Sequence, residues 1–174
     1  MLRQGRPSPW ILPDTCGRVF CILFRFVSTR PSHIGLCVDD LERSVRFYCD
    51  GLGFEQAEGY DLDDQMLDGI DRALEVSAPV KLRSQMIKLG DLKIELLHFT
   101  EPRPTGAAST TRGQIGFTHL SLFVDDVDAV AARLSALGGT VLGGTRAQLG
   151  YEVVFVADPD GARVELMAPP SPSS

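Results

Sequence analysis

The string "SHIGLCVDD" at residues 32–40 returns in altered form as "THLSLFVDD" at residues 118–126. In both copies a His follows a hydroxyl residue, and an apolar run then leads to Val-Asp-Asp. The chain of 174 residues contains three His, and two of them, His33 and His119, occupy equivalent places in this repeat. The repeat indicates an internal duplication and makes the two His the first candidates for a shared site.

The repeat also includes the ends of the two halves. The string "DLKIELL" (91–97) aligns with "GARVELM" (161–167), so Glu95 is equivalent to Glu165. The two His are 86 positions apart and the two Glu are 70 positions apart. The segment between His and Glu is therefore 16 residues longer in the first half than in the second. We expect the extra length in the acidic stretch 59–80, either as a lid helix or as a solvated insertion.

Each half is predicted to contain one strand, one helix and two or three antiparallel strands. An Asp pair suits the start of each helix, and Gly53 and Gly138 mark the helix ends. This order predicts an α+β fold of two similar modules, here placed at 31–100 and 117–169 with a linker at 101–116. Residues 1–30 are expected to form an N-terminal extension, a loose arm or a strand on a partner subunit, with an Arg-rich transit peptide as an alternative. Residues 170–174 are expected to form a disordered tail.

Composition limits the class of protein. Hydrophobic residues make up 44% of the chain and charged residues 23%, as in soluble globular proteins. The net charge of −6 offers no basic footprint for nucleic acid. The apolar run at 19–27 is interrupted by Arg25 and is too short to cross a membrane. The four Cys have no paired spacing, which favours free thiols in a reducing compartment such as the cytoplasm.

Strand parity predicts a site. Side chains alternate between the faces of a strand, so the two His lie opposite the aliphatic residues that pack under the helices. Glu95 and Glu165 also oppose aliphatic neighbours. If the two modules meet with these faces together, two imidazoles and two carboxylates converge, a donor set that suits zinc, nickel, cobalt or iron. The alternative is that each residue is an ordinary polar side chain on a solvated sheet, but four at duplicated positions favour the metal.

The same alternation predicts which residues line the space where the two modules would meet, here called the cup. Cys37 and Phe123 face it from the two His strands, and Tyr151 borders it from a loop. Arg163 flanks Glu165, where it would meet an anionic substrate or form a salt bridge at the strand edge. His98 falls on the opposite face, where a packed or hydrogen-bonded role is expected.

Three strings resemble the vicinal oxygen chelate superfamily, which includes glyoxalases, bleomycin resistance proteins and dioxygenases. They are "SHIGLCVDDLERSVRFYCDGLGF", "FTHLSLFVDDVDAVAARLSALGG" and "VVFVADPDGARVELM". The resemblance implies paired βαβββ modules that form a curled mixed sheet around one divalent metal ion, and a homodimer. It also implies that the metal ligands are His33, Glu95, His119 and Glu165. This set is similar to that of bacterial glyoxalase I, and "KIELLHF" looks like a strand of methylmalonyl-CoA epimerase.

The resemblance and the donor set together predict a metal-dependent lyase or isomerase that acts on a small molecule with adjacent oxygens. The metal would act as a Lewis acid that stabilises an enediolate, and Glu165 or Glu95 would be the general base beside the carbonyl. An iron-dependent extradiol dioxygenase is an alternative, although such enzymes use two His and one Glu, without a ligand at the position of Glu95. A drug- or metabolite-binding resistance protein is another, although such proteins usually lose the His residues.

Overall fold

The structure is a computed structural model that describes residues 29–111 and 113–169. Its contacts divide the chain into Met1–Pro31 and Ser32–Ser174, and all helices and strands described below belong to the second unit. The predictions for the extension at 1–30 and for the tail fall almost entirely outside the described residues. None of the helices in the described ranges is both long and apolar enough to cross a membrane.

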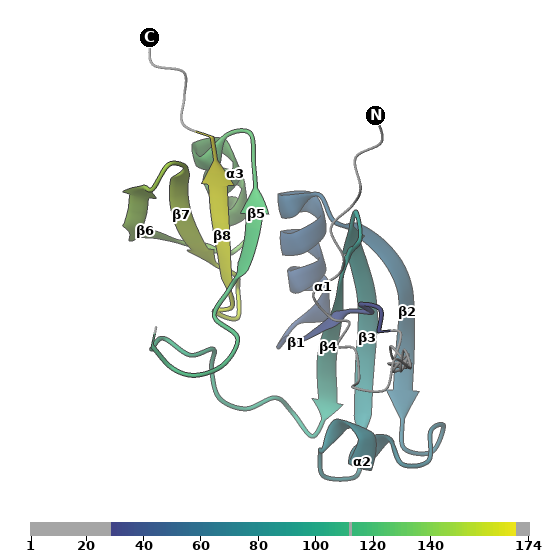
Figure 1. The fold of residues 1–174 in the computed structure, drawn as a ribbon. Helices are drawn as coiled ribbons and strands as arrows, with labels where there is room; N and C mark the ends of the chain where they lie inside the picture. Colours follow the sequence, from purple (N-terminus) through teal and green to yellow (C-terminus); the bar gives the residue numbers. More distant parts are fainter. Residues whose placement is uncertain (1–28, 112, 170–174) are drawn as a thin grey trace, which may run out of the picture. The chain divides into compact units, whose positions relative to one another are not determined.

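The first half folds into a four-stranded mixed sheet with three helical segments. In the sheet, β1 is parallel to β4, and β4, β3 and β2 are antiparallel neighbours, in the order β1-β4-β3-β2 (Figure 1). The elements are β1 (Ile34–Cys37), α1 (Leu41–Val45), the π-helical η1 (Arg46–Gly51), β2 (Glu55–Asp63), α2 (Ile70–Leu74), β3 (Lys81–Leu89) and β4 (Leu92–Glu101).

The second half repeats this topology in the order β5-β8-β7-β6, with β5 parallel to β8. Its elements are β5 (Leu120–Phe123), α3 (Val127–Ala136), β6 (Thr140–Gln148), β7 (Glu152–Ala157) and β8 (Arg163–Ala168). The α+β prediction of two βαβββ modules is therefore confirmed. The described strands form two separate sheets rather than one continuous curled sheet.

The second Asp of each Val-Asp-Asp string caps a helix. The carboxylate of Asp40 accepts a hydrogen bond from the Arg43 backbone N–H, and that of Asp126 accepts one from Ala129, both at 2.9 Å. Each cap satisfies a backbone donor that the first turn of a helix leaves without an intrahelical partner. The hydrogen bond from Arg43 also lowers the pKa of Asp40. The chain therefore turns from strand to helix at the same point in both modules. As a result, the strands that follow His33 and His119 have equivalent positions in the two modules.

One hydrophobic core joins the two modules. Leu96 of β4 and Leu166 of β8 are fully buried in it, together with Phe47 of η1 and Leu134 of α3. The helical segments approach closely, since a Cβ added at Gly51 would lie 2.6 Å from the Leu134 side chain. Aliphatic residues of both sheets pack against helices, as parity predicts, which leaves the opposite sheet faces for polar side chains.

Polar contacts lock the D-P-D-G turn of the second module onto the first. The buried Tyr48 hydroxyl donates to Asp158 Oδ2 at 2.9 Å, while the backbone N–H groups of Asp160 and Ala162 donate to Asp158 Oδ1. Asp160 in turn accepts from the Arg43 guanidinium. Burial raises the pKa of Asp158, against the lowering effect of the hydrogen bond from Tyr48. We refer to the Tyr48–Asp158 and Arg43–Asp160 contacts together as the turn latch.

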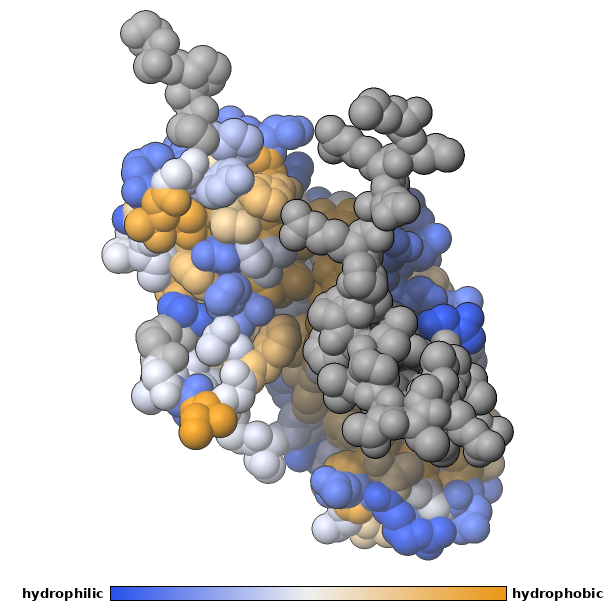
Figure 2. Space-filling view, in the orientation of Figure 1, coloured by the Kyte–Doolittle hydropathy of each residue, from blue (hydrophilic) through white to orange (hydrophobic). Residues whose placement is uncertain are grey.

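The extra length of the first half lies where it was expected, between β2 and β3. It forms α2, and Ile70 of this helix packs with Val80 and Leu82 in a second, smaller core that also includes Leu97 and Phe99 of β4. In Figure 1 α2 lies at one end of the first sheet, and the surface at this end of the molecule is mostly hydrophilic in Figure 2. By strand parity Leu97 shares the face of Glu95, so the insertion is anchored on that face of the sheet.

Candidate active site

Each module holds one His–Glu pair at the equivalent place. The Nε2 atom of His33 lies 3.1 Å from Glu95 Oε2, and that of His119 lies 3.4 Å from Glu165 Oε2. Glu95 is in register with Gly35 of β1, and Glu165 with Ser121 of β5. The parallel pairing of the His strand with the Glu strand therefore brings together residues that are far apart along the chain.

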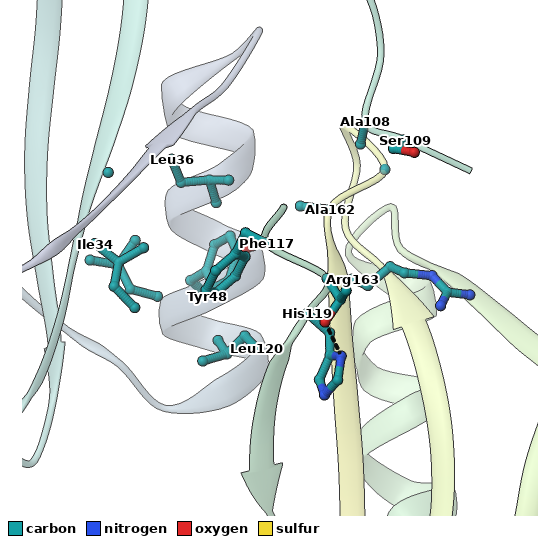
Figure 3. Close-up of a pocket in the computed structure, with 14 residues that line it drawn as sticks. Ile34, Leu36, Tyr48, Ala108, Ser109, Phe117, His119, Leu120, Ala162 and Arg163 are labelled. Carbon is teal, nitrogen blue, oxygen red and sulfur yellow. Dashed lines mark hydrogen bonds between the residues drawn. The ribbon is translucent and has the colours of Figure 1, made fainter. Parts of the chain in front are cut away.

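Hydroxyl groups position both imidazoles. Ser32 Oγ lies 3.1 Å from His33 Nδ1, and Thr118 Oγ1 lies 2.9 Å from His119 Nδ1, the contact drawn in Figure 3. When such a hydroxyl accepts the Nδ1 proton, Nε2 is left as an acceptor or a metal ligand. The hydroxyl residue before each His is visible in the sequence repeat, but its role becomes clear only from the structure.

Two further hydroxyls, which the sequence analysis did not single out as site residues, position the carboxylates. Ser121 donates to Glu165 Oε2 from the adjacent strand β5, at 2.6 Å. The equivalent place on β1 is Gly35, which has no side chain, and there the buried Ser84 of β3 donates to Glu95 Oε1 at 2.6 Å instead. Each Glu is thus held by one Ser and one His, by a different route in each module.

The donor atoms of each pair suit a divalent cation. Two ligand atoms that each lie about 2.1 Å from one metal ion are roughly 3.0–3.4 Å apart when the ligand–metal–ligand angle lies between the octahedral and the tetrahedral value. The distances within both pairs, 3.1 and 3.4 Å, are those of a His–Glu ion pair and also match that separation. Within residues 29–111 and 113–169, however, no three His, Cys, Asp or Glu side chains gather in a way that would hold a metal ion. The chain therefore presents two pairs of possible ligands rather than one cluster of four.

Two cavities border the second pair. One of about 440 Å³ is lined by apolar side chains of both modules, among them Ile34, Leu36 and Tyr48 (Figure 3), and by His119 and Arg163. The other, about 540 Å³, is formed by the linker together with His119, Arg163 and the Phe155 ring. Both volumes fall in the range of small-molecule sites.

The four predicted wall residues lie in three different places. Phe123 and Tyr151 lie together, with ring centroids 5.4 Å apart, and both are exposed. Arg163 lies near the second pair, because its guanidinium packs on the ring of Phe155. Phe155 was not among the residues predicted from the sequence. The pairing of β7 with β8 places its ring next to Glu165.

Cys37 lines a different cavity, of about 740 Å³, beside the turn latch. Partial burial, followed by the charges of Asp160 and Asp39, raises the pKa of its thiol, which favours the protonated form. His98 is half-buried, with Nδ1 3.3 Å from the carbonyl oxygen of Val38, which confirms its hydrogen-bonded role.

Known proteins resemble this chain over most of its length. The sequence profile of the glyoxalase/bleomycin resistance protein/dioxygenase superfamily matches residues 30–166. The chain belongs to this superfamily. A 2-epi-5-epi-valiolone epimerase from Actinomyces sp. is 32% identical over 149 residues, which cover 80% of this chain and 79% of the epimerase.

Two other members extend the comparison. The catechol-2,3-dioxygenase of Bacillus subtilis (strain 168) is 28% identical over 143 residues, which cover 79% of this chain but only 41% of the dioxygenase. The crystal structure of a glyoxalase family protein from Bacillus cereus superposes with a TM-score of 0.71 at 17% identity and covers 84% of this chain and 97% of its own. The superfamily thus contains enzymes that act on small molecules, and its members commonly use a divalent metal ion.

Proposed function

We propose that this chain is a divalent-metal-dependent lyase or isomerase that moves a proton next to a substrate carbonyl. The observation that carries the proposal is the pair of His–Glu contacts at equivalent places in the two modules, each with donor atoms at the separation expected of ligands to one cation. His33, Glu95, His119 and Glu165 would hold the ion. When bound, the ion supplies a Lewis acid for substrate oxygens, whether it is zinc, nickel, cobalt or iron.

The side chains of the chain then have distinct tasks. The hydroxyls of Ser32 and Thr118 orient the two imidazoles, and Ser84 holds one oxygen of Glu95 while His33 contacts the other. On Glu165, by contrast, Ser121 and His119 both contact Oε2. This arrangement favours Oε1 of Glu165 as the atom that accepts a proton from the substrate carbon and returns it, with Glu95 as the alternative base.

The place to which the proton returns on the substrate decides the type of reaction. Return to the neighbouring carbon gives a glyoxalase-type isomerisation, and return to the opposite face of the same carbon gives an epimerisation. The similarity to an epimerase over about four-fifths of both chains supports the second outcome. Phe123 and Tyr151 offer exposed rings that would contact an apolar part of the substrate.

A ring-cleaving iron dioxygenase is the second candidate, and the 28% identity to a catechol dioxygenase favours it. Such an enzyme consumes oxygen and is expected to tolerate the loss of Glu95. The proton-transfer enzyme needs Glu95 and no oxygen. An oxygen electrode with the wild type and Glu95→Gln therefore separates the two candidates.

The two pairs must meet for one ion to engage all four residues. We infer a homodimer in which the His33–Glu95 pair of one copy faces the His119–Glu165 pair of the other. Among the described strands β1 and β5 each have a sheet neighbour on one side only, so both leave an edge for such an approach. The free thiols of Cys37 and Cys49 agree with a cytoplasmic enzyme.

The decisive experiment combines metal content with proton exchange. Purified protein is analysed for bound metal, and deuterium uptake from heavy water is followed in 2-oxo-aldehydes, cyclic hydroxyketones and acyl thioesters, before and after chelation. The Glu165→Gln variant should lose exchange, whereas Glu58→Gln, an exposed change on β2, should retain it. Full exchange by Glu165→Gln, or by metal-free wild type, would refute the proposal.

A further inference from the structure

The face of the second sheet that carries the His119–Glu165 pair has a polar end and an apolar end. Side chains on this face come from alternate residues of β5, β8 and β7, which lie side by side (Figure 1). Ser121 of β5 is in register with Glu165 of β8, and two residues further along the strands Phe123 is in register with Met167. The surface around the His–Glu pair therefore continues directly into an apolar surface.

Two aromatic side chains, Phe123 and Tyr151, lie at this apolar end, and we refer to them as the ring pair. Their ring centroids are 5.4 Å apart, and the ring planes are tilted by 58°. Tyr151 belongs to the turn between β6 and β7, where the Leu149 backbone N–H donates to the Tyr151 carbonyl oxygen at 2.9 Å. Gly150 supplies the positive φ of 82° in this turn. A defined turn, rather than strand pairing, therefore brings Tyr151 to Phe123.

Packing within the domain does not explain the ring pair. Phe123 is 66% exposed and Tyr151 is 43% exposed, and neither joins a hydrophobic core of the described residues. Single exposed apolar residues are ordinary, but two large rings in contact beside polar functional groups indicate a binding surface. Strand geometry separates Phe123 from Ser121 by about 7 Å along β5, and Ser121 donates to Glu165. One small molecule can therefore contact the rings and Glu165 together.

Within the described residues of the first module, nothing corresponds to the ring pair. Cys37 occupies the place of Phe123 and is in register with Leu97, where the second module has Met167. The turn equivalent to that of Tyr151 is replaced by the insertion with α2, between β2 and β3. The His–Glu pairs and the helix caps are duplicated, whereas the rings are not. The rings therefore suit a task that only one module performs, such as binding one end of the substrate.

We propose that Phe123 and Tyr151 bind an aromatic ring of the substrate, and hence that the substrates are aryl carbonyl compounds. A planar ring packs on two tilted rings through offset and edge-to-face contacts, which a saturated ring of similar size does not make. The inference rests on the proposed function, because it assigns the adjacent oxygens of the substrate to the Glu165 end. It narrows the compounds named there to their aryl members, such as aryl 2-oxo-aldehydes and cyclic hydroxyketones fused to an aromatic ring.

The test uses two uncharged probes with the same adjacent oxygens, 2-hydroxyacetophenone and 1-cyclohexyl-2-hydroxyethanone, and binding is measured by calorimetry on the full chain. Wild type should bind the aryl probe about tenfold more tightly than the cyclohexyl probe. Phe123→Leu and Tyr151→Leu remove a ring but keep an apolar side chain, so each should lower this preference to about threefold or less. Tyr151→Phe should retain the preference, and Tyr60→Leu, which removes an exposed ring on β2, should leave it unchanged. Circular dichroism confirms that each variant is folded.

Three results would overturn the assignment. They are no preference of wild type for the aryl probe, an unchanged preference in both Leu variants, or dissociation of the oligomer by Phe123→Leu in sedimentation experiments, which would assign the rings to a subunit contact. Titrations of the chelator-treated protein separate this inference from the proposed function. A ring-dependent preference without metal stands even if Glu165→Gln keeps proton exchange, and normal metal-dependent exchange stands even if wild type does not prefer the aryl probe.

Discussion

Removal of the Tyr48 hydroxyl tests how the two modules are held together. Tyr48→Phe keeps the ring in the core but leaves Asp158 Oδ2 without the hydrogen bond donated from 2.9 Å. Both residues are buried, at 2% and 3% relative exposure, so water does not readily replace the lost donor. A buried polar group left unsatisfied costs about 1–3 kcal/mol, so we expect the free energy of unfolding to fall by about 2 kcal/mol. For a domain of this size that lowers Tm by roughly 4–8 °C.

The loss should also depend on pH. Burial raises the pKa of Asp158 in the folded protein, while the hydrogen bond from Tyr48 opposes that rise. In Tyr48→Phe the folded-state pKa should therefore be higher still. A raised carboxyl pKa means that the folded state binds the proton more tightly than the unfolded state, so stability falls as pH rises through the interval between the two pKa values. The variant should lose more stability at neutral pH than at the acidic limit of folding.

Urea unfolding of the wild type and Tyr48→Phe, followed by circular dichroism at several pH values, measures both effects. Tyr60→Phe is the matched control, because Tyr60 is 54% exposed on β2, and its stability should change by less than about 0.5 kcal/mol. If Tyr48→Phe were as stable as wild type, or if its loss were the same at every pH, the account of the turn latch would be wrong.

Three further outcomes follow from the site and the insertion. In the first test, inactive His33→Ala and His119→Ala copies are mixed one to one and allowed to exchange subunits. If the site is shared across a dimer, metal binding should return at about a quarter of the sites, whereas sites built within one chain would regain none. Ser84→Ala should weaken metal affinity about 10- to 100-fold by releasing one oxygen of Glu95, measured by chelator competition, with unchanged affinity as the contrary result. Ile70→Ala should lower the free energy of unfolding by about 2 kcal/mol or more in urea titrations, since it removes the side chain that anchors α2, and a neutral effect would mean that the insertion does not depend on that core.

Much of the candidate site follows from local patterns along the chain. Alternation along the strands determines that His33, Glu95, His119 and Glu165 leave the core, and the repeat determines that they are equivalent in pairs. Capping by the second Asp of each string is equally local, because the cap and its partner are three residues apart. These features need only the geometry of one strand or one turn.

Other features depend on register between distant strands, which periodicity does not specify. The donor to Glu95 is Ser84 from β3 because β1 offers only Gly35 at that level, whereas Ser121 serves Glu165 from β5. The contact of Phe155 with both His119 and Arg163 likewise depends on how β7 pairs with β8.

The amino-acid sequence by itself determined two βαβββ modules and four possible ligands, because helix caps and strand alternation act over a few residues. Only the tertiary structure decided that these ligands stand as two His–Glu pairs on separate sheets. The physical reason is that the shared core and the turn latch, which set one module against the other, are made of contacts between side chains up to 117 positions apart.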